Sequence, residues 1–394
     1  MAPGPVGTER WSRPRASSPA TPSATEPRRS VRCRIHPQRG GAGVAYAEAV
    51  IPVFDGHNDT LTSEGRGGIG AGRADGHLDL PRMRAGGMRG GIFAVFTPSP
   101  GEDEGPLKLA AGAAGAFAKP LAAPVPHPVA AADATAAAGR LARLEREGLL
   151  TVAREIGDVD AAFADPAAPP VAVLHLEGAE AIDSGLEALE HWHAAGLRSL
   201  GPVWSRANAF ATGVQFAFPS SPDIGPGLTA AGRALVGACA ELGILVDLSH
   251  LNEAGFWDVA GLEAGPLVAS HSGAHAVAAA SRNLTDAQLD AIAASDGLVG
   301  IVFAAPFLRP DFADDPATPL ALIVEHARYV ADRIGSRHVA LGSDFDGATI
   351  PAELGDVAGL PKLLEALAAA GFDAEQLADV GWRNWRRVLD AWWR

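Results

Sequence analysis

Five short motifs carry acidic and imidazole side chains of the types that bind divalent metal ions. They are Asp55-Gly56-His57-Asn58-Asp59, Leu176-Glu177-Gly178, Asp247-Leu248-Ser249-His250, Ser270-His271-Ser272 and Gly342-Ser343-Asp344-Phe345-Asp346-Gly347. Such a set could hold two adjacent cations and leave one carboxylate free to move a proton. The motifs therefore predict a hydrolase that uses two metal ions.

The spacing of these residues agrees with a shared site. His57 and Asp59 are two residues apart on an extended strand end, so both side chains can reach one cation. Glu177 follows an apolar strand and could span two cations about 3.5–4 Å apart. His250 and His271 are 21 residues apart, which is one strand–helix unit of a barrel. Taken singly, the His57–Asp59 pair is better explained as a strand-end histidine hydrogen-bonded by a nearby carboxylate, and Glu177 as a solvated loop acid; the five residues together favour a metal site.

Two further residues could complete the chemistry. Asp344 lies in a glycine-rich turn after the last strand, where its carboxylate could act as a general base without binding metal. Its neighbour Asp346 is better explained as a turn residue. Arg282, eleven residues after His271, offers a fork for a substrate carboxylate. A surface arginine at a helix start explains Arg282 equally well.

Other histidines are predicted to lie outside the site. His175 precedes Glu177 by two residues, and we expect its side chain to point out of the strand. His326 and His338 fall in segments away from the strand ends and are expected at the surface.

Short apolar runs alternate with longer helical patterns from Val50 onward, as in βα units around a parallel sheet. The runs are residues 51–54, 91–97, 171–176, 199–203, 244–248, 267–270, 298–303 and 339–342. They predict an α/β fold, a (β/α)8 TIM-like barrel with loop insertions over residues 49–394. Functional side chains of such barrels gather at the carboxyl ends of the strands, and the candidates named above follow this rule.

Composition limits the class of protein. Residues 1–48 are rich in Pro, Ser and Arg, so we expect a disordered basic tail there, without the apolar segment of a secretory signal. The net charge of −14 disfavours nucleic-acid partners. Only Cys33 and Cys239 are present, which excludes a disulfide framework and a cysteine-based zinc site. Since no run of about 18 apolar residues occurs, we expect a cytoplasmic protein without membrane contact.

Together the motifs resemble the renal, or membrane, dipeptidase family of zinc peptidases (peptidase family M19), within the amidohydrolase-like barrels. The resemblance covers about residues 50–390 and includes the closing Gly381-Trp382-Arg383-Asn384 segment. It implies two zinc ions per chain. His57 and Asp59 would hold one, His250 and His271 would hold the other, and Glu177 would bridge both.

The resemblance also implies a reaction, the hydrolysis of dipeptides that have a free C-terminal carboxylate. A hydroxide bridging the metals would attack the peptide carbonyl, and Asp344 would pass the proton to the departing amine. Arg282 would grip the substrate carboxylate, with the adjacent Asn283 as a further candidate contact. A homodimer is suggested as well.

One position departs from the family pattern. Where members usually carry a histidine that contacts the substrate carbonyl, this chain has Trp204, which becomes a candidate substrate contact. The donor for that oxygen is then unassigned, with Arg206 and Asn208 nearby in the sequence. Two alternatives remain open: a related amidohydrolase-type enzyme acting on a lactam, cyclic amide or ester, and a metal-stabilised binding protein that has lost catalysis.

Overall fold

Eight parallel strands form the centre of the computed structural model, which describes residues 51–62, 68–100 and 116–393. Their order in the sheet is β8, β6, β5, β2, β1, β11, β10 and β9. The strands are β1 (Val53–Asn58), β2 (Met88–Phe96), β5 (Val171–Glu177), β6 (Leu197–Gly201), β8 (Leu245–Val246), β9 (Val268–Ser272), β10 (Leu298–Ile301) and β11 (Val339–Leu341). A parallel bridge between Asp247 and Val268 joins the two outer strands, so the sheet is a nearly closed barrel. The predicted (β/α)8 fold is confirmed.

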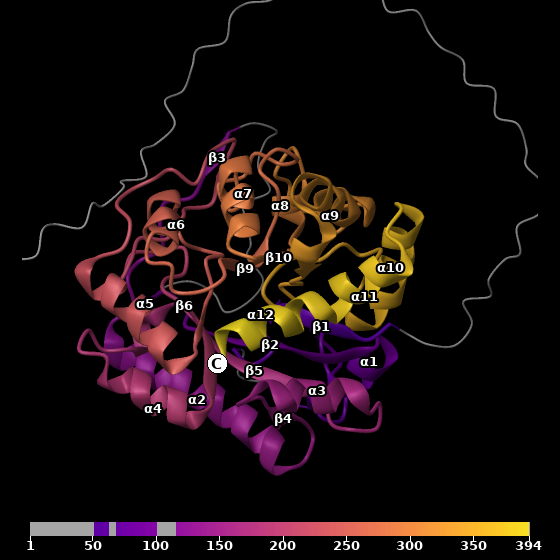
Figure 1. Ribbon diagram of the computed structural model, residues 1–394, viewed down its shortest axis with the longest axis horizontal. Coiled ribbons are helices and arrows are strands. Elements are labelled where there is room, and N and C mark those ends of the chain that lie inside the picture. Colours follow the sequence, from indigo (N-terminus) through magenta and orange to yellow (C-terminus); the bar gives the residue numbers. More distant parts are fainter. Residues whose placement is uncertain (1–50, 63–67, 101–115, 394) are drawn as a thin grey trace, which may run out of the picture. The chain divides into compact units, whose positions relative to one another are not determined.

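Helices lie between the strands and surround them (Figure 1). They are α1 (Leu80–Ala85), α2 (His127–Arg146), α3 (Ile156–Ala164), α4 (Glu187–Ala195), α5 (Ala230–Leu242), α6 (Glu253–Ala260), α7 (Asp286–Ala294), α8 (Ala305–Leu308), α9 (Ala321–Ile334), α10 (Leu360–Ala369), α11 (Ala374–Ala378) and α12 (Asn384–Trp392). Side chains fix where several begin. Thr229 accepts a hydrogen bond from Gly232 N before α5, and Thr285 forms a capping box with Gln288 before α7.

Shorter elements complete the chain. They are the 3₁₀ turns η1 (Ala179–Ala181), η2 (Ser336–His338) and η3 (Val357–Gly359), the π-helical turn η4 (Asp379–Arg383), and the short strands β3 (Phe117–Ala118), β4 (Thr151–Val152) and β7 (Ala217–Phe218). β4 pairs with the start of β5. β3 and β7 pair with each other, and this pairing joins the loop after β2 to the loop after β6 on the side where the barrel strands end.

Two predictions about the whole chain stay open. The predicted disordered tail, residues 1–48, lies outside the described ranges, so both its disorder and the boundary after it stay predictions. Within those ranges, none of the helices has the length and hydropathy that crossing a bilayer requires. The cytoplasmic location stays a prediction.

The strands bury their polar ends together with their apolar residues. β1, β5 and β9 are buried along their whole length, and they include His57, Glu177 and His271. In these three strands the apolar run of the sequence ends before the strand does. Backbone pairing continues past the run into polar residues, as between Asn58 and Phe93. These side chains therefore stand on the last strand residues and not in the loops beyond. Burying polar groups is unfavourable unless they find partners or ligands, so the strand ends mark a functional site.

Candidate active site

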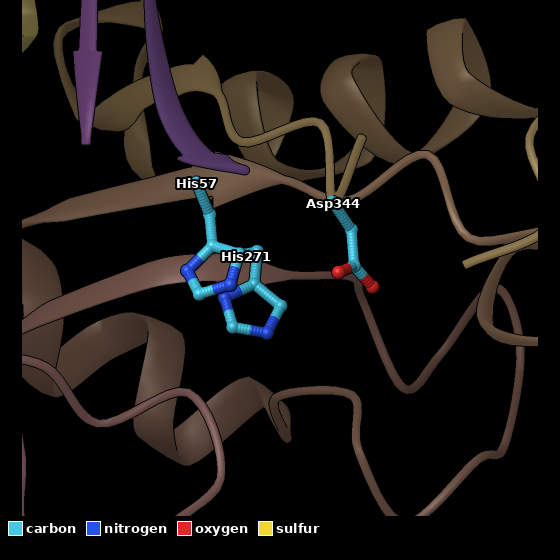
Figure 2. A group of neighbouring side chains, drawn as sticks. All are labelled: His57, His271 and Asp344. Atoms are coloured by element: carbon cyan, nitrogen blue, oxygen red, sulfur yellow. The ribbon is translucent and has the colours of Figure 1, made fainter. Parts of the chain in front are cut away.

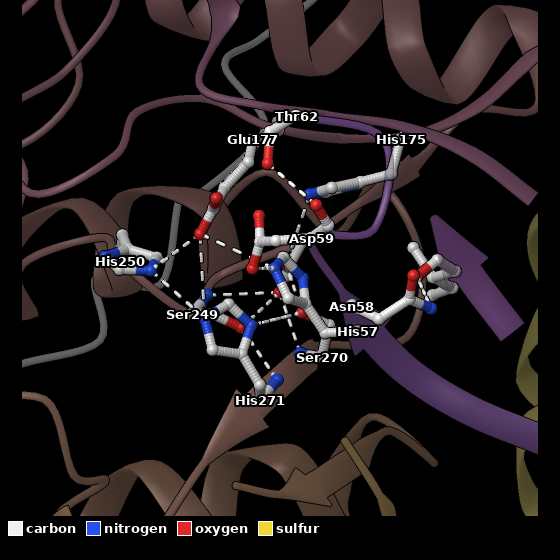
Figure 3. Close-up of polar contacts among 12 residues, drawn as sticks. His57, Asn58, Asp59, Thr62, His175, Glu177, Ser249, His250, Ser270 and His271 are labelled. Atoms are coloured by element: carbon white, nitrogen blue, oxygen red, sulfur yellow. Dashed lines mark hydrogen bonds and ion pairs between the residues drawn. The ribbon is translucent and has the colours of Figure 1, made fainter. Parts of the chain in front are cut away.

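The polar side chains at the strand ends converge on one small volume (Figure 3). Glu177 Oε1 lies 2.9 Å from His250 Nε2 and 3.7 Å from His271 Nε2. His57 Nε2 lies 3.7 Å from the same oxygen and 3.5 Å from Asp59 Oδ2. The other four side chains predicted as metal ligands thus lie around the Glu177 carboxylate.

The hydrogen bonds of His271 determine which of its nitrogens carries the proton. Ser270 Oγ donates its single proton to Asp247 Oδ2 at 2.5 Å. It must therefore accept from His271 Nδ1, which lies 2.9 Å away. His271 Nε2 is left with a free lone pair that faces the Glu177 carboxylate. The Asp247 carboxylate thus orients this imidazole through Ser270.

His250 is oriented in the same way. Arg282 Nη2 lies 3.1 Å from His250 Nε2, and since arginine has only donors, this nitrogen accepts. His250 Nδ1 carries the proton and lies 2.8 Å from Ser205 Oγ. His250 Nε2 and His271 Nε2 are 3.0 Å apart. Both nitrogens are unprotonated, so each carries a lone pair. Two imidazole lone pairs and a carboxylate oxygen at such short range fit a divalent cation that binds nitrogen and oxygen ligands.

His57 provides a second indication of metal binding. It is fully buried, yet neither ring nitrogen has a hydrogen-bond partner in the described part of the chain. Burial alone would lower the pKa of His57, but the Glu177 and Asp59 carboxylates raise it to about 10. These carboxylates favour positive charge at the position that His57 Nε2 faces. His57, Asp59 and Glu177 are close enough to ligate one ion, and so are Glu177, His250 and His271.

Burial also shifts the pKa values of three other groups in the cluster. Burial raises the pKa of Glu177 well above its usual range, although the charge of His57 opposes this. Burial and then the Arg282 charge hold the pKa of His250 well below its usual range. Burial and then the His57 charge do the same for His271. Both imidazoles are therefore neutral near pH 7, as metal ligation requires.

Asp344 stands beside this cluster, next to His57 and His271 (Figure 2). It is partly exposed, unlike the five predicted ligands, and its backbone has a left-handed φ of 61°. Asp344 N donates to His57 O at 3.0 Å, which ties the turn to the end of β1. Gly347 has no side chain, and a Cβ there would collide with the carboxylates of both Asp59 and Asp344. The turn therefore holds the Asp344 carboxylate at the edge of the cluster, close to Asp59 and within reach of an ion shared with His57 and His271.

The metal-free protein should lose stability as the pH rises through 7, and Asp344 should contribute to this loss. Burial and then the Asp59 carboxylate raise the pKa of Asp344 to about 7, above the value of about 3.9 in an unfolded chain. Between these values only the folded state holds the proton, so the stabilisation is complete below the unfolded pKa and disappears as the pH rises through the folded pKa. Urea midpoints of chelator-treated protein from about pH 5 to 8 check this. Asp344→Asn should show a shallower fall, and equal slopes would contradict the assignment.

Arg282 borders the cluster on the His250 side. It is buried, and its guanidinium donates to Ser249 O and to His271 O, the latter at 3.3 Å. The guanidinium carbon lies 5.5 Å from the centre of the Phe307 ring. Arg282 is therefore no surface residue, and it holds a positive charge beside the ligands.

Asn283, the neighbour of Arg282, does not border the cluster but ties two segments of backbone together. Its side-chain amide donates to Ala278 O at 2.9 Å and to Phe307 O at 2.8 Å. These bonds join the loop after β9 to α8. The structure does not bring Asn283 into the polar cluster, so the sequence prediction of a substrate contact gains no support from its position.

Trp204 forms an aromatic wall next to the cluster. Its ring centre lies 5.7 Å from that of His250 and 4.8 Å from that of Phe96. The Arg206 guanidinium lies 5.2 Å from the Trp204 ring centre, while Arg206 Nε donates to Glu180 Oε1 at 2.8 Å. Asn208 Nδ2 also donates to Glu180 Oε1, at 3.2 Å. The two donors that the sequence offered for a substrate oxygen are thus both bound to Glu180.

The prediction that His175 points out of its strand is wrong. His175 is fully buried inside the barrel, and its Nδ1 lies 2.9 Å from Ser199 Oγ. Because side chains alternate along a strand, a residue two before Glu177 faces the same side, and this signal was present in the sequence. His326 and His338, expected at the surface, are also buried. His326 Nδ1 accepts from Ala274 N at 2.9 Å, and His338 Nδ1 lies 2.9 Å from Gly297 O.

Comparison with known proteins agrees with this site. The family model for membrane dipeptidases (peptidase family M19) matches residues 46–392. A curated relative from Acinetobacter calcoaceticus, described as an uncharacterized protein in the PQQ-III 3′ region, is 36% identical over 293 residues, 72% of this chain and 90% of that protein. Among solved structures, the dipeptidase AC, a metallo peptidase of family M19, is 45% identical, with 88% of this chain and 99% of that chain covered and a TM-score of 0.80.

A second solved structure is a metallo peptidase from Rhodobacter sphaeroides liganded with a phosphinate mimic of the dipeptide L-Ala-D-Ala. It is 44% identical, the comparison covers 88% of this chain and 100% of that chain, and the TM-score is 0.82. The chain therefore belongs to the membrane dipeptidase family (peptidase family M19) and is a metallo-dipeptidase.

Proposed function

We propose that this protein is a binuclear zinc dipeptidase that hydrolyses dipeptides with a free C-terminal carboxylate. The observation that carries the proposal is the convergence of unprotonated imidazole nitrogens on the Glu177 carboxylate in a buried site. His57 and Asp59 would hold one zinc ion, and His250 and His271 would hold the other. Glu177 lies close enough to both pairs to serve as the shared ligand.

The residues around the ligands have separate tasks in this proposal. Zinc held by these residues would supply a water of lowered pKa as nucleophile and would polarise the carbonyl oxygen of the substrate. Asp344 moves the proton from the attacking water to the departing amine, because its carboxylate is partly exposed at the edge of the cluster. Arg282 binds the substrate carboxylate and thereby selects the last peptide bond.

Small dipeptides with apolar side chains are the proposed substrates. The solved relative from Rhodobacter sphaeroides was liganded with a mimic of L-Ala-D-Ala. In this chain, the wall beside the cluster is apolar and is formed by Trp204, Phe216, Phe307 and Phe312. These four side chains themselves carry no charge that could pair with a substrate side chain. The homodimer suggested by the family resemblance stays a prediction.

The dipeptide amide should be a much poorer substrate than the free dipeptide. An arginine–carboxylate pair contributes roughly 1.5–3 kcal/mol, so amidation should lower kcat/KM by about 10–100-fold. The measurement is the release of free amino acids from L-Ala-L-Ala, L-Ala-D-Ala and their C-terminal amides by zinc-loaded protein. Arg282→Lys should reduce the difference, because lysine cannot form the bidentate pair.

Two outcomes would favour the alternatives. Equal hydrolysis of acid and amide would point to an amidohydrolase-type enzyme acting on a lactam, cyclic amide or ester. A protein that binds zinc but releases no amino acid from any dipeptide of the panel would point to a binding protein.

A further inference from the structure

His175 lies inside the barrel, next to the cluster of predicted metal ligands. It stands two residues before Glu177 on β5, with its side chain on the same face. It pairs in register with Ser199 of β6, and the 2.9 Å contact between His175 Nδ1 and Ser199 Oγ fixes the plane of the ring. His175 Nε2 is left without a hydrogen-bond partner in the described ranges, although it is fully buried.

Asp247 lies next to that nitrogen. Its Oδ2 is 3.7 Å from His175 Nε2 and accepts a hydrogen bond from Ser270 Oγ. Its Oδ1 accepts from Ser249 N, Ser249 Oγ and Ser270 N. Four donors thus hold this buried carboxylate in place, and Oδ2 retains a lone pair on the side of His175.

His57 completes the group. Its Nε2 faces Asp59 and Glu177, so Nδ1 is the nitrogen that remains for the other side of the ring. The His57 and His175 rings meet nearly edge to face, at 78° and with centres 5.7 Å apart. One ligand atom from each of His57, His175 and Asp247 lies within 4.8 Å of the other two. Atoms at such separations can all lie about 2.8 Å from one central water oxygen.

From this juxtaposition we infer that His175 is a positioning residue for His57. One internal water accepts the proton of His57 Nδ1 and donates to His175 Nε2 and to Asp247 Oδ2. His175 Nδ1 donates to Ser199 Oγ, so each of these nitrogens has a partner. The chain of hydrogen bonds holds His57 in the tautomer whose Nε2 carries the lone pair and faces Asp59 and Glu177. The inference rests on the proposed zinc site.

Zinc affinity tests this role independently of turnover. His175→Leu removes both ring nitrogens at similar volume, so it should weaken zinc binding at the His57 and Asp59 position by about 10–100-fold. Competition with a chromophoric chelator gives the two affinities of the full chain. Anomalous diffraction from crystals prepared with substoichiometric zinc identifies the position that has weakened. His175→Gln can still hydrogen-bond to the water, so its affinity should lie between those of the wild type and the leucine variant.

Ser205→Ala is the matched control. Ser205 hydrogen-bonds to His250, so this variant should weaken the position of His250 and His271 and leave the His57 position unchanged. Unchanged affinity at the His57 position in His175→Leu would overturn the inference. So would an equal loss in the leucine and glutamine variants, because packing alone would then explain it. Wild-type protein that binds no zinc at His57 would overturn the proposed zinc site itself, and with it this inference.

Discussion

Asp344→Asn should lower kcat for dipeptide hydrolysis by about 10²–10⁴-fold, the usual contribution of a positioned general acid or base. Asparagine has nearly the same shape, but it cannot take up and release a proton near neutral pH. Zinc content should not change if Asp344 only moves a proton: it is the only one of the six that is partly exposed, although it lies close enough to His57 and His271 to ligate an ion with them. Steady-state kinetics and metal analysis of the same preparation measure both quantities.

Asp311→Asn is a suitable control for the Asp344 variant. It makes the same chemical change on an exposed carboxylate, which pairs with Arg309 two residues earlier in the chain and accepts a hydrogen bond from Ala313 N. Its kcat should equal that of the wild type. Full turnover in Asp344→Asn would remove Asp344 from the mechanism, whereas lost turnover together with lost zinc would reassign it as a ligand.

The barrel could be predicted because its strands are buried on both faces. Such strands have nearly continuous apolar sequences, and helical patterns between them are typical of parallel sheets. The strand ends could not be predicted equally well. β1 continues to Asn58 and β9 to Ser272, and backbone pairing of polar residues has no apolar signature. The pairing of β3 with β7 was missed for a related reason, since two residues per strand carry no periodic pattern.

The predicted ligands lie together in the structure because the rule that places functional side chains at the carboxyl ends of barrel strands follows from the geometry of the barrel. Residues that follow different strands must lie on one face, wherever they stand in the chain. The hydrogen-bond partners behind the ligands obey no such rule. Ser205 reaches His250 from a loop after β6, and only the folded chain shows that it orients this imidazole. The partner of Arg206 was equally hidden, because Glu180 is 26 residues earlier and follows a different strand.

Trp204 shows how the folded chain changes the interpretation of a single position. In the sequence it is the residue that replaces a substrate-contacting histidine. In the structure it packs against His250, Phe96 and Phe216 and lies over the Arg206 guanidinium. Phe96 comes from β2 and His250 follows β8, whereas Arg206 and Phe216 belong to the same segment after β6 as Trp204. The position has therefore become part of an apolar wall, and this wall motivates the proposal of apolar dipeptide side chains.

Glu177→Gln should have the largest effect on the metal site. The Glu177 carboxylate is the group on which His57, His250 and His271 converge. Glutamine keeps one oxygen but removes the negative charge, so it should bind a shared pair of cations far more weakly. We expect zinc content below two ions per chain and a loss in kcat/KM of about 10³-fold or more, since each 1.36 kcal/mol of lost transition-state stabilisation is a factor of ten.

Glu180→Gln is the matched control. It shows whether the loss of any buried acid near the site has the same effect as the loss of Glu177. Glu180 is buried three residues further along the chain, where it binds Arg206 and Asn208. Its replacement should lower the thermal midpoint, because a buried guanidinium loses its countercharge, while zinc content stays at the wild-type level. Metal analysis after dialysis and kinetics at saturating zinc distinguish the two variants. If Glu177→Gln kept two zinc ions and wild-type kcat/KM, Glu177 could not be the shared ligand, and the proposed bridging role of this residue would fail.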